Sequence, residues 1–217
     1  MFGNSHTAAN GLPAMLEAML KAARPGKSVA VVNAPGFLFL DERERDAASL
    51  SLFQRQKWSA VVFQAQRYSS SGTVDYSIAE AVNWVALTRA RQMVPVMFPE
   101  WPRRGIAETP RIFELHISIA ALQPACVAPI PQAWDLALSR FSDIVLHASD
   151  GNHSSPAGAF LTASILFATM TGNSPLDLPT FPNFGVDDPT QQRLRAVADD
   201  QVKLLSPHLY CPNDVRF

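Results

Sequence analysis

Residues 58–64, with the sequence WSAVVFQ, decide the fold class of this chain. They form a short apolar, β-branched run without a charge, which is typical of a strand buried on both faces of a sheet. Similar runs occur at residues 28–33 (SVAVVN), 94–98 (VPVMF) and 125–130 (ACVAPI), and a weaker one at 144–147 (IVLH). We predict a strand at each of these places.

Segments with helical periodicity separate the predicted strands. In the first of them, Met15, Leu16, Met19 and Leu20 form one apolar stripe, and Pro13 suits the first helical position. Helices are predicted at residues 13–23, 41–56, 76–93, 109–122, 133–140, 157–170 and 188–205.

Strands that alternate with helices of this length indicate βαβ units and a mostly parallel sheet covered on both faces. We therefore predict an α/β protein, a three-layer α/β/α sandwich with a flavodoxin-like sheet. No linker divides the chain, so residues 1–217 are expected to form a single domain. Within it, residues 176–217 are expected to form a loop and a C-terminal helix that packs on the flank.

The composition bounds the classes of function. The 217 residues are 47% hydrophobic, which is sufficient for a buried core, and their formal net charge is −1. This balance gives no electrostatic case for nucleic acid or an anionic membrane as a partner. No apolar run reaches the roughly 20 residues that span a bilayer, so no transmembrane segment is predicted.

Two cysteines, Cys126 and Cys211, lie far apart in the sequence and lack metal-ligand spacing. Two buried free thiols are the favoured interpretation, and a disulfide is the alternative if the protein is exported. The five histidines form neither HxH nor HExxH, so no metal site is predicted. No GxGxxG or P-loop follows a predicted strand, which disfavours a nucleotide cofactor.

Ser5 is the first residue that suggests chemistry. It follows an apolar residue and a glycine and precedes a helix, a position that exposes a hydroxyl above the sheet. Backbone N–H groups at such a junction can hold an oxyanion. A serine in a turn is more often only a cap, so a neighbouring base is needed before Ser5 indicates catalysis.

Asp150 and His153 form a candidate acid–base pair near the other end of the chain. Three residues apart in a turn, they can face each other through a carboxylate–imidazole hydrogen bond. Taken alone, this segment is an ordinary turn before the helix that Ser155 is predicted to cap. Taken with Ser5, it supplies the base and the orienting carboxylate that a serine nucleophile needs.

These two segments resemble the end blocks of a known superfamily. Residues 3–7 (GNSHT) resemble the first block of SGNH/GDSL hydrolases, in which the nucleophilic serine lies in a GDS-like motif. Residues 150–158 (DGNHSSPAG) resemble the last block, an Asp-x-x-His followed by a helix. The order of the blocks also agrees, and the resemblance covers nearly the whole chain. It implies a serine esterase with Ser5 as nucleophile, His153 as base, Asp150 as its orienting carboxylate, and no cofactor.

The resemblance further implies an oxyanion hole. Its donors would be the N–H of Ser5 and a glycine after a strand, a position that Gly36 matches. The family commonly adds an asparagine after the next strand, where this chain has Gln64, whose amide can donate the same hydrogen bond. A polar residue that only closes a strand is an equally good interpretation of Gln64.

Trp101 and Arg103 are weaker candidates for contact with a substrate. They follow the strand predicted at residues 94–98, where they could border a cleft and hold an anionic or sugar group. A solvated loop is the more ordinary interpretation. His6 is expected to make a local hydrogen bond rather than to act in catalysis.

The N-terminus departs from the family pattern. The nucleophile should follow a central strand, but only four residues precede Ser5, fewer than the five or six of an average strand. We therefore expect a first strand truncated in this sequence and a natural start upstream of Met1, which is compatible with an upstream leader peptide.

The combined interpretation is a serine hydrolase that cleaves carboxylic esters through an acyl-enzyme. Short acyl groups, such as acetate on a carbohydrate or a small molecule, are the expected substrates. Two alternatives stay open. One is an acyltransferase that uses the same triad with an acceptor other than water, and the other is a non-catalytic ligand-binding protein.

Overall fold

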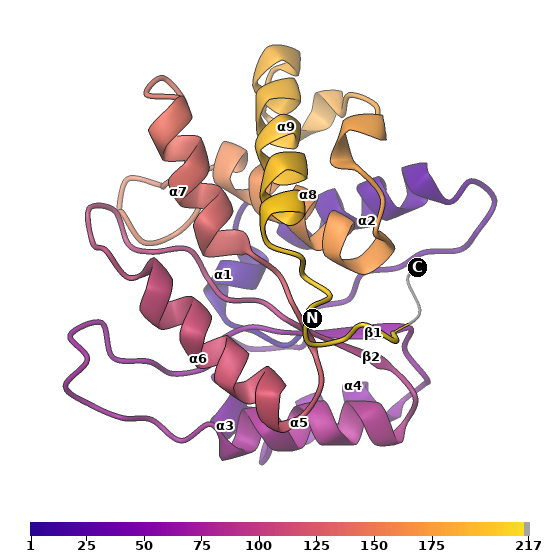
Figure 1. The fold of residues 1–217 in the computed structure, drawn as a ribbon. Helices are drawn as coiled ribbons and strands as arrows, with labels where there is room; N and C mark the ends of the chain where they lie inside the picture. Colours follow the sequence, from indigo (N-terminus) through magenta and orange to yellow (C-terminus); the bar gives the residue numbers. More distant parts are fainter. Residues whose placement is uncertain (215–217) are drawn as a thin grey trace.

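The computed structural model, which describes residues 1–214, is a three-layer α/β/α sandwich (Figure 1). Its parallel sheet contains β1 (Ala60–Phe63), β2 (Val94–Met97) and β3 (Cys126–Val127), in that order. Val62 on β1 lies opposite Val96 on β2, and Val96 lies opposite Cys126 on β3. The predicted fold class is confirmed.

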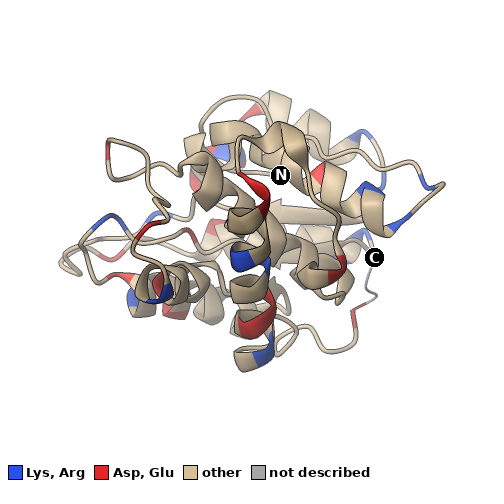
Figure 2. Ribbon diagram, turned by 90° about the horizontal axis from the view of Figure 1, so that it is seen from above, with Lys and Arg blue, Asp and Glu red and all other residues tan. Residues whose placement is uncertain are grey.

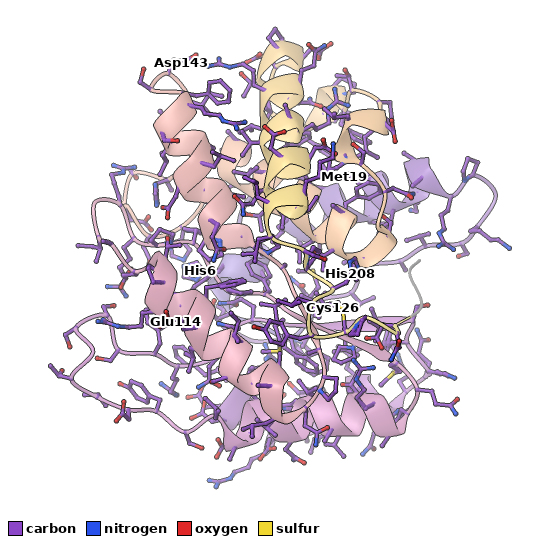
Figure 3. The ribbon with its side chains drawn as sticks, viewed as in Figure 1. His6, Met19, Glu114, Cys126, Asp143 and His208 are labelled. Atoms are coloured by element: carbon purple, nitrogen blue, oxygen red, sulfur yellow. A yellow bond between two sulfur atoms is a disulfide. The ribbon has the colours of Figure 1, made fainter. Side chains whose placement is uncertain are left out.

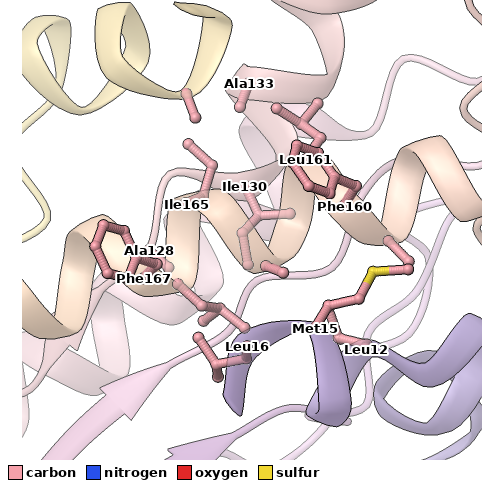
Figure 4. Packing of buried hydrophobic residues seen from close by; sticks show 14 of the residues in the cluster. Leu12, Met15, Leu16, Ala128, Ile130, Ala133, Phe160, Leu161, Ile165 and Phe167 are labelled. Atoms are coloured by element: carbon pink, nitrogen blue, oxygen red, sulfur yellow. The ribbon is translucent and has the colours of Figure 1, made fainter. Parts of the chain in front are cut away.

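Helices cover both faces of the sheet. One hydrophobic cluster joins the sheet to α2, α7, α8 and α9, and Figure 4 shows part of it. A second cluster joins the sheet to α4, α5 and α6. The α-helices are α1 (Ser5–Ala8), α2 (Leu12–Ala23), α3 (Leu40–Arg43), α4 (Ala47–Gln54), α5 (Ala79–Ala90), α6 (Thr109–Leu122), α7 (Ile130–Arg140), α8 (Pro156–Thr171) and α9 (Asp188–Leu204). Short 3₁₀ turns lie at Ala9–Gly11, Pro175–Asp177 and Pro182–Phe184.

Helix α8 is buried over most of its length and fixes the loop before it. Ser155 caps its first turn by accepting the N–H of Gly158, Pro156 occupies the first position, and the left-handed Gly172 ends it. A Cβ on Gly158 would lie 2.6 Å from the Trp134 ring, so only glycine allows this close contact with α7. The segment before α8 is thus held by a rigid element.

The first residues occupy the position expected for a central strand, but they form only an isolated parallel bridge. The Phe2 N–H donates to the Val62 carbonyl, and the Gln64 N–H donates to the Phe2 carbonyl, each at 2.8 Å. On the other side, the Met1 carbonyl accepts the Ala34 N–H at 2.8 Å. This bridge sets the next residues at the carboxyl ends of the strands.

The prediction of a strand at residues 28–33 is wrong. These residues form no ladder with any strand in residues 1–214, and a cavity of about 470 Å³ separates them from β1. Val29, Val31, Leu16 and Val62 are among its mainly apolar lining. A β-strand needs a neighbouring strand that pairs with its backbone. Among residues 1–214, this segment has such backbone pairing only with Met1.

Two predicted strands are shorter than expected. The strand at residues 125–130 ends at Val127, because Pro129 lacks an N–H and α7 starts at once. The strand at residues 144–147 is reduced to one antiparallel bridge between His147 and Ser154. That bridge closes the loop that carries Asp150 and His153.

The predicted helix at residues 41–56 is two helices, α3 and α4. The break is stabilised by Asp46, whose side chain accepts the Ser49 N–H and caps α4. The bounds of the remaining helices agree with the prediction within a few residues, and those of α6 are the predicted ones at both ends. Helix α9 packs against α8 and α7.

The prediction of two free thiols is wrong, because Cys126 and Cys211 form a disulfide (Figure 3). The bond joins the edge strand β3 to the C-terminal segment, where the Val127 N–H also donates to the Pro207 carbonyl. The tail therefore closes the open edge of the sheet.

Charged residues of both signs are interspersed along the ribbon (Figure 2). No helix in residues 1–214 is long and apolar enough to cross a bilayer.

Candidate active site

Ser5 begins α1 directly above the carboxyl end of β1. Asn4 caps this short helix by accepting the His6 N–H at 3.0 Å. A Cβ on Gly3 would lie 2.6 Å from Gln64 Oε1, so the chain approaches the end of β1 as closely as only glycine permits. The sharp turn leaves the Ser5 side chain partly accessible at the top of the sheet.

Ser5, His153 and Asp150 form one hydrogen-bonded chain, although 148 residues separate the first two. His153 Nε2 lies 2.8 Å from Ser5 Oγ, and His153 Nδ1 lies 2.5 Å from Asp150 Oδ2. If Nδ1 carries the proton and donates to the carboxylate, Nε2 is free to accept the serine proton. This is the geometry of a serine nucleophile with its base and orienting carboxylate; the catalytic roles themselves stay predictions.

The Asp150 carboxylate is well suited to stay ionised. Its second oxygen accepts the N–H groups of Asn152 and His153, both at 2.9 Å. The hydrogen bond with the His153 side chain, followed by these two N–H groups, holds the pKa of the Asp150 carboxyl well below its usual range. An ionised Asp150 fixes the imidazole in one orientation.

Two anchors hold the loop that carries this pair. Asn10, in a left-handed conformation between α1 and α2, donates its side-chain N–H to the Ser154 carbonyl at 2.5 Å. Trp101 donates its indole N–H to the Asn152 carbonyl at 2.8 Å. One anchor comes from the nucleophile segment and the other from the segment after β2, so His153 is held from both sides.

The prediction that Trp101 contacts a substrate is wrong. Its side chain is 1% exposed, because it stacks on Trp134 with ring centroids 4.5 Å apart. Trp101 therefore supports the loop from inside the core. Arg103 is exposed beside this core, and its N–H donates to Glu108 Oε2 at 3.0 Å; its contact with a substrate stays a prediction.

His6 and Glu100 also line the candidate site, although no motif in the sequence indicated Glu100. The His6 ring stacks on His153 with centroids 5.1 Å apart, and its Nδ1 lies 3.0 Å from Asn4 Oδ1. Glu100 Oε2 lies 4.0 Å from the same nitrogen. Its place two residues after a predicted strand was the available signal, because such positions face ligands in parallel sheets.

Gln64 connects the two sides of the site. Its Oε1 accepts the Asn4 N–H at 2.9 Å, and its Nε2 donates to Glu100 Oε2 at 2.6 Å. One of its two amide protons is thus already used, and the side chain is fully buried. This geometry favours a positioning role for Gln64, while donation to an oxyanion through its second proton stays a prediction.

The N–H groups of Ser5 and Gly36 are available as donors. Neither finds an acceptor among residues 1–214. Gly36 has a φ of 73°, a left-handed conformation that turns the chain between residue 34 and α3. The role of these two N–H groups as oxyanion donors stays a prediction.

Solved structures of similar fold were found. A protein from Slackia heliotrinireducens, described as "a putative SGNH hydrolase", is 26% identical, with a TM-score of 0.64 over 78% of this chain and 96% of that one. A DUF4886 family protein from Bacteroides uniformis is 17% identical, with a TM-score of 0.72 over 95% of this chain and 94% of that one. No family profile and no curated protein matches the sequence. The chain has an SGNH-hydrolase-like fold, as the end blocks predicted.

Proposed function

We propose that this protein is a serine hydrolase of the SGNH type that cleaves carboxylic esters. The observation that supports it is the hydrogen-bonded chain from Ser5 Oγ through His153 to Asp150. Similarity to a solved structure described as "a putative SGNH hydrolase" supports the reaction class. Short acyl esters of carbohydrates or small molecules are the proposed substrates.

In the proposed reaction, Ser5 Oγ attacks the ester carbonyl carbon while its proton passes to His153 Nε2. The N–H groups of Ser5 and Gly36 donate to the carbonyl oxygen as it becomes negative. When the tetrahedral intermediate collapses, the C–O bond to the alcohol breaks and His153 returns the proton to the departing oxygen. Water then attacks the acyl carbon while its proton passes to His153. The bond between that carbon and Ser5 Oγ breaks, His153 returns the proton to Ser5 Oγ, and the acid leaves.

Active-site labelling tests this proposal most directly. A fluorophosphonate transfers its phosphonyl group to an activated serine with loss of fluoride, and peptide mass spectrometry then identifies the modified residue. We expect the label on Ser5, together with turnover of an aryl acetate. Ser5→Ala should abolish both, and His153→Ala should remove most of both, while circular dichroism stays unchanged.

The outcomes separate this function from its two alternatives. A folded protein that neither labels nor hydrolyses any aryl ester would reject catalysis and favour a ligand-binding role. Labelling at Ser5 with acyl transfer to an added alcohol or sugar, in preference to water, would indicate an acyltransferase. Turnover by Ser5→Ala close to that of the parent would reject Ser5 as nucleophile.

A further inference from the structure

Arg43, in the last position of α3, is buried directly beneath the candidate site. Its side chain is 0% exposed, yet it donates to backbone carbonyls rather than to carboxylates. One terminal nitrogen lies 2.5 Å from the Gly3 carbonyl and 3.1 Å from the Gly36 carbonyl. The other lies 3.1 Å from the Pro35 carbonyl and 2.7 Å from Ser49 Oγ. The three carbonyls belong to the two turns that carry Ser5 and the Gly36 N–H.

A buried guanidinium without a contacting carboxylate is unfavourable and needs a reason. Asp46 and Glu42 act on Arg43 from a distance, but neither forms an ion pair with it among residues 1–214. Burial lowers the pKa of Arg43 from its usual value, which is the mark of a cation held away from water. The guanidinium offers five donors in a rigid plane, so it can hold several carbonyls at once.

The planarity of the peptide bond links these contacts to the oxyanion donors. In a trans peptide, the C=O and the N–H of the same unit point in opposite directions, and residues 1–214 contain no cis peptide. With the Pro35 carbonyl directed at Arg43, the Gly36 N–H must point away from it. With the Gly3 carbonyl directed at Arg43, the Asn4 N–H points away to Gln64 Oε1, where the structure has it.

We propose that Arg43 is the positioning residue of the oxyanion hole. It ties the nucleophile turn at Gly3 to the turn at Pro35 and Gly36, and it directs the Gly36 N–H toward the ester carbonyl oxygen. This role rests on the proposed hydrolase function. Arg43 itself touches no reacting atom, so its effect is expected on the rate of the chemical step rather than on substrate binding.

The test compares Arg43→Lys and Arg43→Gln with the parent chain and with Ser49→Ala. Lysine keeps the charge but loses the planar fork, and glutamine keeps one amide donor without the charge. Ser49→Ala is the matched control, because it removes a hydrogen bond of the Arg43 side chain that does not involve either turn. Aryl acetate kinetics and the rate of fluorophosphonate labelling are measured where circular dichroism shows each variant folded.

We expect both Arg43 variants to lose at least roughly tenfold in kcat and in labelling rate, with KM within about twofold of the parent, because a displaced oxyanion donor acts in the transition state. Ser49→Ala should stay within about twofold in kcat. A folded Arg43→Lys or Arg43→Gln variant with parental kcat would overturn the proposal, as would loss of folding in both. If the parent neither labels nor turns over, the hydrolase proposal itself fails, which is a different result.

Discussion

The Asp150 carboxylate accepts three hydrogen bonds, but only the one from the His153 ring reaches toward Ser5. The two N–H contacts would survive replacement by an amide oxygen, whereas the charge that favours the imidazolium would not. At the scale of single residues, Asp150 therefore orients and stabilises a base that can still act without it.

This distinction predicts an order of effects in the proposed triad. His153→Ala should lower kcat by on the order of 10³-fold or more, since no other group takes the serine proton. Asp150→Asn should cost less. Its amide N–H faces His153 Nδ1 and favours the tautomer that carries the proton on Nε2, but the minor fraction of the ring with a free Nε2 can still act as base. Aryl acetate kinetics at saturating substrate measure both, with thermal melting as the control for folding. Equal losses in the two variants would contradict the ranking.

Gln64 offers a second prediction at this scale. If its free amide proton donates to the oxyanion, Gln64→Ala should lower kcat on the order of 10²-fold with little change in KM. Thermal stability should fall in either case, because the Asn4 N–H and Glu100 lose their partner. If Gln64 only holds these two groups, kcat should fall by less than about tenfold. Steady-state kinetics of the variant decide between the two.

His116 makes stability depend on pH independently of the site. Burial within α6 lowers the pKa of His116 from 6.5 to about 4, although its hydrogen bond to the Ile112 carbonyl opposes this. Between these values the unfolded chain binds the proton and the folded chain does not, so the stabilisation is complete above pH 6.5 and is lost as the pH falls toward 4. The shift corresponds to roughly 3 kcal/mol.

Urea unfolding of the parent and of His116→Leu at several pH values measures this effect. The parent should lose stability relative to the variant as the pH falls from 6.5 to 4, and the difference should be constant above pH 7. The buried amino group of Met1, whose pKa burial lowers to about 5, titrates in both proteins and cancels from the comparison. A pH-independent difference would show that His116 is not buried as a neutral ring.

The residues that the sequence identified and those that it missed differ in a physical way. Ser5 and the Asp150–His153 pair were predicted because each lies in a short local motif whose residues interact within a turn. Glu100 and Arg43 were not, because their partners come from other parts of the chain and only the fold brings them together. Trp101 was misjudged, since its position after a strand is compatible with either a cleft or the core.

At the scale of elements, periodicity predicted the helices well because their apolar stripes are set by neighbours in the sequence. Strands depend on partners elsewhere in the chain. Residues 28–33 have the composition of a strand, but within residues 1–214 only Met1 and Phe2 lie between them and β1, and no ladder forms. Asp46 likewise divided a predicted helix because a side-chain cap competed with continuation of the helix.

Trp101, in the segment between β2 and α6, helps to position the loop that carries His153. Trp101→Phe keeps an aromatic ring in the core but removes the hydrogen bond to the Asn152 carbonyl, so the loop that carries His153 loses an anchor. We expect a loss of about 1 kcal/mol in stability and a roughly threefold to tenfold lower kcat. Thermal melting and aryl acetate kinetics measure the two effects.

Trp134→Phe is the matched control for this prediction. Trp134 belongs to the same stacked pair, but its indole N–H donates to Thr162 Oγ1 on α8, away from the loop. It should lose at least as much stability as Trp101→Phe while kcat stays close to that of the parent. A similar fall of kcat in both variants would indicate general loosening of the core rather than loss of a loop anchor.

At the scale of the whole molecule, the disulfide is the feature that composition could not decide. Two distant cysteines are compatible with free thiols or with a bond, and only the path of the C-terminal segment along β3 brings them together. The same segment is held there by the ion pair between Arg89 and Asp214. The bond therefore holds the segment that closes the sheet edge at β3, while the proposed triad lies at the carboxyl ends of the strands.

The disulfide is expected to stabilise the fold without taking part in the chemistry. It joins residues 85 apart in the sequence, and a loop of this length lowers the entropy of the unfolded chain by the equivalent of about 4–5 kcal/mol. For a chain of this size, reduction should lower Tm by about 10 °C. At 25 °C, where the reduced protein should still be folded, kcat for an aryl acetate should be unchanged, because no triad residue contacts either sulfur within residues 1–214.

The double variant Cys126→Ala, Cys211→Ala is the control: it should melt near the reduced parent, and its Tm should not respond to dithiothreitol. If the Tm of the parent does not change on addition of dithiothreitol, the bond is absent in solution. If kcat falls in the folded, reduced protein, the C-terminal segment and the candidate site are coupled through β3.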